Sequence, residues 1–184
     1  MLQRLISLVI IFLPGSLCAQ TADLKPLEIK GHVIGESIAE LLNKEPEVRQ
    51  KVMVCEQHPH QPTCDGLLAA VRLGQRSEVS TSNWMSFVLE GGKLAKLTTL
   101  VNGMADEVKA DLTRKFGPQS SETSFPMQNA MGTKWEDHLS VWDMPAVYVG
   151  LHEDNNPASQ NHHLVLVIES REEHARENTE AEKQ

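Results

Sequence analysis

The sequence predicts an α+β fold, a two-layer sandwich in which helices pack on one face of an antiparallel sheet. Three observations lead to this prediction. Gly91-Gly92 separates two apolar runs, which is typical of a β-hairpin. Apolar residues recur on one helical face between 105 and 116. Short polar turns then separate three apolar runs that predict strands, at 139–142, 146–152 and 162–169.

The region before the hairpin predicts a strand followed by helix. Residues 27–30 favour the strand. Ser37, followed three residues later by Glu40, predicts a capping box at a helix N-terminus. Pro46 either ends that helix or starts the next one. For residues 67–71, a short strand and a helical turn both stay open.

The hairpin is expected to join strands at 84–89 and 94–101. The helix over 105–116 follows, and Gly117-Pro118 is a strong signal for its end. Residues 119–122 predict a polar loop, and 127–135 favour no single element. From residue 171 onward the chain is charged and has no apolar side chain larger than alanine. We therefore expect 171–184 to be a disordered tail.

The first residues have the order of a secretory signal peptide. Arg4 precedes an apolar run over 5–13, and small residues then favour cleavage after Ala19. The apolar run is much shorter than the roughly 20 residues that a membrane-spanning helix needs. We expect a signal peptide over 1–19 and a periplasmic or secreted mature chain without a membrane span. Acylation of Cys18, as in a lipoprotein, is an alternative.

Composition limits both the size of the fold and its partners. The chain has 184 residues, 40% of them hydrophobic and 23% charged, so we expect one folded domain over 20–170. The formal net charge is −8, and no stripe of lysine and arginine offsets it. Nucleic acid and anionic membrane surfaces are therefore poor candidates for a partner.

A cluster of cysteine and histidine lies in a proline-containing loop. Cys55, His58, His60 and Cys64 follow one another within ten positions. In an oxidising compartment two nearby cysteines usually pair, so we expect a Cys55–Cys64 disulfide and no bound cofactor or metal. The alternative is a zinc or copper site that uses all four side chains, because thiolate and imidazole are suitable ligands for these metals.

The sequence contains no familiar catalytic pattern. There is no G-x-S-x-G elbow, no G-x-G-x-x-G after a strand and no phosphate-binding G-x-x-x-x-G-K-[ST] loop. Adjacent residues of a strand point to opposite faces, so neither Glu136-Asp137-His138 with Asp154 nor His162-His163 should converge on one site. We therefore assign no catalytic residues, and an envelope hydrolase is only a minor alternative.

The three tryptophans carry much of the aromatic surface of the chain. We expect Trp142 to pack in the core between helix and sheet. A sheet face with exposed tryptophan would instead indicate a binding surface, since tryptophan is enriched at interaction hot spots.

Two stretches, 84–94 and 107–118, together with Gln128-Asn129 and Trp142, resemble small uncharacterised exported proteins of bacteria. Residues 30–37 are similar to the start of β-lactamase-inhibitor-protein-like modules. The resemblance implies helices paired with an antiparallel sheet and a role in binding other proteins of the cell envelope. It supplies no catalytic residues. We expect a non-enzymatic binding or accessory protein, with a metal-binding protein as the alternative.

Overall fold

The computed structural model describes residues 28–157 and 163–183. The predicted signal peptide, Cys18 and His162 lie outside these residues. The described helices are α1 (Ile38–Lys44), α2 (Pro46–Gln57), α3 (Asp65–Leu73), α4 (Ala105–Phe116) and α5 (Arg171–Ala181). The described strands are β1 (Glu28–Ile29), β2 (His32–Val33), β3 (Ser77–Ser80), β4 (Met85–Glu90), β5 (Lys93–Val101), β6 (Ser121–Gln128), β7 (Lys134–Asp143), β8 (Val147–Asp154) and β9 (His163–Ser170).

Seven strands form one antiparallel sheet in the order β3-β4-β5-β9-β8-β7-β6, and β1 pairs with β2 in a separate ribbon. A three-strand meander, β3 to β5, is followed by α4 and then by a four-strand meander, β6 to β9. The last strand returns to the first meander, with Leu97 opposite Ile168. The predicted α+β class, the antiparallel sheet and the hairpin at Gly91-Gly92 are confirmed.

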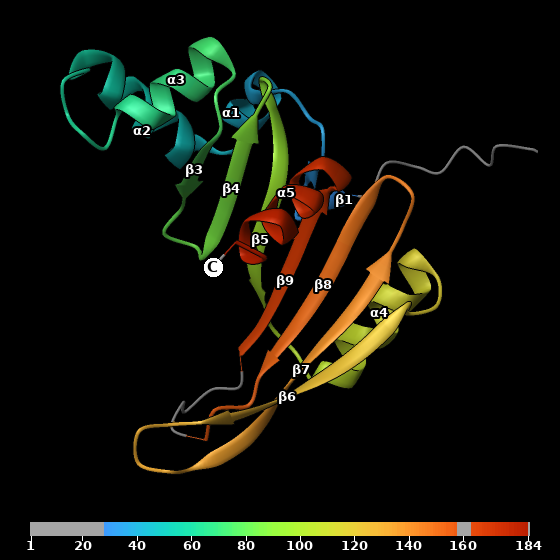
Figure 1. Ribbon diagram of the computed structural model, residues 1–184. Helices are drawn as coiled ribbons and strands as arrows, with labels where there is room; N and C mark the ends of the chain where they lie inside the picture. Colours follow the sequence, from blue (N-terminus) through green and yellow to red (C-terminus); the bar gives the residue numbers. More distant parts are fainter. Residues whose placement is uncertain (1–27, 158–162, 184) are drawn as a thin grey trace, which may run out of the picture.

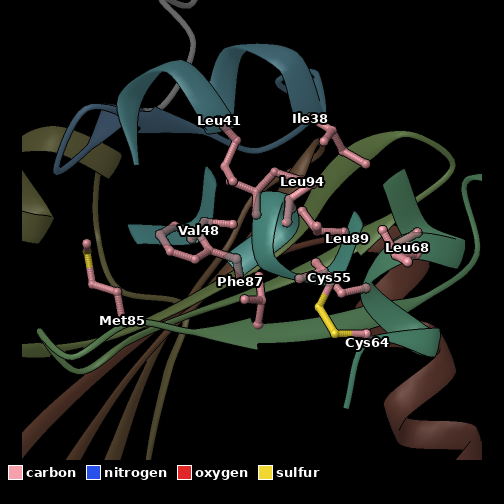
Figure 2. Packing of buried hydrophobic residues seen from close by; sticks show 14 of the residues in the cluster. Ile38, Leu41, Val48, Cys55, Cys64, Leu68, Met85, Phe87, Leu89 and Leu94 are labelled. Atoms are coloured by element: carbon pink, nitrogen blue, oxygen red, sulfur yellow. A yellow bond between two sulfur atoms is a disulfide. The ribbon is translucent and has the colours of Figure 1, made fainter. Parts of the chain in front are cut away.

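Helices α1, α2 and α3 cover the first meander and form one hydrophobic cluster with it, which Figure 2 shows from close by. Leu41 and Val48 of these helices and Phe87 and Leu89 of β4 are completely buried. The predicted capping box is present: Ser37 accepts a hydrogen bond from the Glu40 amide, and the Glu40 carboxylate accepts one from the Ser37 amide. Pro46 is the first residue of α2, so of the two predicted alternatives it starts the next helix. Residues 67–71 are helical and belong to α3.

Helix α4 has the bounds that the sequence predicts and packs over β7, β8 and β9 in a second cluster. Leu112 of this helix is buried with Val149 and Leu151 of β8. Trp142 is only 1% exposed, which confirms its predicted place in the core. Ile29 packs against both clusters, so the β1–β2 ribbon joins the two halves of the core.

Helix α5 lies on the opposite face of the sheet from α4. Val149 points toward α4, so its neighbour Tyr148 points to the other face, where His174 of α5 stacks on it. Figure 1 shows α5 crossing in front of β5 and β9, with α4 behind the β6–β7 part of the sheet. The expectation that all helices share one face is therefore wrong.

The same helix also corrects the expected disordered tail, because residues 171–181 are helical and Glu173 is completely buried. Sequence reasoning failed here because it looked for an apolar face, and α5 has none.

Both edges of the sheet are polar. Strand β6 was missed, because all eight of its residues are exposed and its sequence has a polar start, Ser121-Glu122-Thr123-Ser124. The Asn129 amide donates a hydrogen bond to the Thr133 carbonyl, so it points toward β7. Backbone N–H groups of an antiparallel strand point alternately toward and away from the paired strand, so the backbone nitrogen of Pro126, three residues earlier, points away from β7. A proline with no N–H at this free edge hinders the pairing of another strand.

Candidate functional site

The turn between β3 and β4 presents an exposed tryptophan in a strained backbone conformation. Trp84 is 75% exposed and has a φ of +58°. This left-handed region is unfavourable for a bulky side chain and persists only where the surroundings impose it. Within the turn, the Thr81 amide donates to the Met85 carbonyl at 2.8 Å, and the Thr81 hydroxyl donates to the same oxygen at 3.3 Å.

Helix α2 anchors this turn from outside. The Glu47 carboxylate accepts hydrogen bonds from the Ser82 amide at 2.9 Å and from the Ser82 hydroxyl at 2.7 Å. Lys51, one helical turn further on, donates to the Ser80 carbonyl and lies 3.3 Å from Glu47. The hydrogen bond from the Ser82 amide, followed by that from its hydroxyl, lowers the pKa of Glu47. Contacts with α2 thus hold the turn in place.

An open pocket of about 460 Å³ lies beside the tryptophan. Its apolar wall comes from Trp84, Met85, Leu100 and Val165, and the rest of its lining consists of serine and threonine residues at 80–82, 86, 98 and 99. None of the described residues that line it is charged. Leu100 and Val165 are paired neighbours on β5 and β9, so the floor of the pocket is the rigid sheet. Such a pocket suits an uncharged, apolar group.

A second hollow of about 590 Å³ lies beside the disulfide, between α2 and the outer edge of β3. Cys55 and Cys64 form a disulfide with sulfur atoms 2.08 Å apart, as predicted. His58 and His60 are exposed in the loop that it closes. The alternative metal site needs two free thiolates, and both sulfur atoms are used in the bond. Within residues 28–157 and 163–183, no three His, Cys, Asp or Glu side chains come together in a way that could hold a metal ion.

Within Glu136-Asp137-His138, the side chains of Asp137 and His138 point in different directions. Asp137 accepts a hydrogen bond from the Asn155 amide at 2.8 Å, whereas the His138 ring contacts the Ser124 hydroxyl at 2.9 Å. These two neighbours lie on opposite faces of β7. His163 begins β9 opposite Asp154. The structure therefore does not bring the carboxylates and histidines of this stretch to one site.

A buried charge cluster near α1 was missed by sequence reasoning. The His32 ring is 2% exposed and lies between two carboxylates, with Nδ1 2.6 Å from Glu36 and Nε2 2.9 Å from Glu45. Its edge meets the Phe87 ring, with centroids 5.1 Å apart. Each ring nitrogen thus lies within hydrogen-bond distance of a carboxylate, and Lys44 gives Glu36 a second partner. The cluster is buried and internally paired, which makes it structural.

The Trp84 turn had a weak signal in the sequence. Ser80, Thr81, Ser82 and Asn83 are typical turn residues and directly precede the tryptophan. The positive φ could not be foreseen, because Asn83 and not Trp84 is the residue type that adopts it more readily.

No family model matches this chain, and no curated protein and no solved structure is significantly similar to it. The resemblance to β-lactamase-inhibitor-protein-like modules therefore stays a prediction. No helix in the described part of the chain combines the length and apolarity that a membrane crossing requires.

Proposed function

We propose that this chain is an exported, non-enzymatic binding or accessory protein of the cell envelope, and that it contacts another protein through the Trp84 turn and the adjoining pocket. The observation that carries the proposal is the exposure of Trp84 on an anchored, strained turn. A rigid exposed tryptophan loses little conformational freedom on binding, and tryptophan is a frequent anchor at protein interfaces.

The periplasmic or secreted location is supported by two independent features. The N-terminal residues have the order of a signal peptide, with Arg4, an apolar run and small residues near Ala19. The Cys55–Cys64 disulfide is of the kind that persists in an oxidising compartment. Among the described residues, the lining of the pocket beside Trp84 consists of apolar side chains and of serine and threonine, with no histidine or carboxylate in that lining to act as a base, which supports a binding role for this site.

The test is site-specific photo-crosslinking of the protein in its own cells. A photoreactive residue replaces Trp84 in one variant and Met131 in another. Met131 is a matched control because it is 86% exposed and lies in the distant β6–β7 turn. We expect a defined crosslinked species from position 84 alone, and its loss when Leu100 is also changed to Glu, which puts a charge into the pocket. Equal crosslinking from both positions, or turnover of substrate by the purified protein, would overturn the proposal.

A further inference from the structure

Helix α5 is held to the sheet mainly by ion pairs. At their centre, Arg76 donates hydrogen bonds to the completely buried carboxylate of Glu173, with Nη2 2.6 Å and Nε 3.1 Å from Oε1. Arg176 lies 3.1 Å from the other oxygen of the same carboxylate. The hydrogen bond to Glu173 raises the pKa of Arg76 above its ordinary value. A buried carboxylate is tolerated only while such partners remain.

Further ion pairs surround this anchor at the rim of the helix. Lys96 on β5 donates to both oxygens of Glu177, at 2.7 and 2.6 Å. Arg76 also lies 3.7 Å from Glu177. Further contacts join α5 to three different strands: Arg176 to Glu90 on β4, His174 to Glu169 on β9, and Arg171 to Asp143 on β7. Pairs at the rim are partly exposed and are weakened by salt.

One aromatic contact supplements the charges. The His174 ring lies on the Tyr148 ring with centroids 3.8 Å apart and an interplanar angle of 14°. The Tyr148 ring in turn lies close to Gly150, where an added Cβ would come within 3.3 Å of it. Burial, followed by the charges of Glu169 and Asp143, raises the pKa of Tyr148.

The surface under α5 continues the face that carries the Trp84 pocket. A small pocket of about 240 Å³, lined in part by Lys96, Tyr148 and Val167, lies between α5 and the sheet. Lys96 and Thr98 are neighbours on one face of β5, and Val167 and Val165 on the same face of β9. Thr98 and Val165 line the Trp84 pocket. The helix therefore covers one end of a sheet face whose other end is open.

We propose that α5 is a releasable lid, latched by the Arg76–Glu173 pair and its rim ion pairs, whose opening lengthens the sheet face that begins at the Trp84 pocket. The use of that face for binding rests on the proposed function, whereas the release itself does not. An isolated helix of this length without an apolar face is marginal in water. Release of α5 therefore unfolds residues 171–183 while the sheet and α4 stay intact.

Hydrogen exchange of the full-length protein tests the release directly. Arg76→Gln removes one of the two arginine partners of the buried carboxylate and leaves Arg176. Arg114→Gln is the matched control, because among the described residues Arg114 pairs with exposed Asp111 on α4. We expect exchange in 171–183 to rise at least tenfold in Arg76→Gln and to stay unchanged in Arg114→Gln, with α4 unaffected in both. For the wild-type protein, we expect exchange in 171–183 to rise at about 1 M salt, where the screening length falls to about 3 Å.

Glu177→Gln provides a milder variant in case Arg76→Gln does not fold, because it weakens the contacts of Glu177 with Lys96 and Arg76 and leaves the Arg76–Glu173 pair in place. Tyr148 is the only tyrosine of the chain, so its ionisation can be followed by ultraviolet absorbance. Release of α5 should shift that titration toward the ordinary pKa of tyrosine. Unchanged exchange and titration in both variants would overturn the proposal, as would exchange that rises equally in α4 and α5. If α5 is released in a variant and crosslinking at position 84 does not change, the result contradicts the proposed function and leaves the release of α5 standing.

Discussion

The Glu47 carboxylate accepts hydrogen bonds from both the amide and the hydroxyl of Ser82, so a helix holds the turn that presents the exposed tryptophan. This contact joins residues that are distant in the sequence, and it explains how an unfavourable φ persists at Trp84.

Replacing Glu47 with Gln should therefore loosen the turn and leave the core intact. The amide keeps one acceptor oxygen but loses the charge and the second acceptor. We expect the fluorine resonance of fluorotryptophan-labelled Trp84 to sharpen and move toward its solvent-exposed position, while that of Trp142 does not change. Glu56→Gln on the same helix is the control. An unchanged Trp84 resonance would show that Glu47 does not hold the turn.

Acid should have the same effect as the Glu47→Gln substitution. The pKa of Glu47 is lowered in the folded protein, so its contribution is complete above the ordinary glutamate value of about 4.3 and is lost as the pH falls through the lowered value. In a pH titration we expect the Trp84 resonance to move only in this acidic window. Glu47→Gln should abolish that movement, and persistence of the same transition in the variant would assign it to another group.

Loss of the disulfide should destabilise the helical cover of the first meander. Cys55 and Cys64 close a short loop between α2 and α3, and both are buried. Restricting the unfolded chain by a loop of this size contributes about 2–3 kcal/mol. We expect the Cys55→Ala, Cys64→Ala double variant to lose at least that much in urea unfolding. Addition of reductant should weaken the wild-type protein and not the variant; a reductant effect on both would refute this explanation.

His32 should be far more sensitive to substitution than an exposed histidine. His32→Leu removes the ring that lies between Glu36, which is buried, and Glu45, which is partly buried. Glu36 keeps Lys44 as a partner, so we expect a loss of about 1–3 kcal/mol for the hydrogen bonds that are not replaced. His58→Leu in the exposed loop is the control. Denaturant unfolding measures both. Equal stability of the two variants would mean that the His32 cluster does not contribute to folding.

Pro126 should limit self-association through the edge of the sheet. Pro126→Thr supplies the N–H that this free edge lacks, and threonine is well suited to a strand. We expect sedimentation velocity to show concentration-dependent association of the variant, and none for a Pro59→Thr control in the disulfide loop. A variant that stays monomeric at every concentration would show that the proline does not protect this edge.

Much of the fold could be predicted because its signals are local. The capping box at Ser37, the glycine pair of the hairpin and the apolar face of α4 each lie within a few consecutive residues. Strand β6 and helix α5 were missed for one physical reason: neither has an apolar face. Strand β6 is an exposed edge, and α5 is held by Arg76, which is far away in the sequence.

The candidate site was only partly predictable for the same reason. The disulfide pairs neighbouring cysteines in a loop, so the sequence was sufficient. The exposure of Trp84 depends on contacts from α2 to the turn, and the polar residues before Trp84 are only a weak local signal of it.

Because β5 pairs with β9, the seven-stranded sheet can be completed only after β9 has been synthesised. Synthesis runs from the N-terminus, so β5 is made before β9. Leu97 and Leu100 on β5 therefore lie at an open sheet edge until β9 has been made. The strand that covers this edge, β9, comes after α4 and three further strands in the chain. Until β9 pairs with β5, this open edge can pair with a strand of a neighbouring copy.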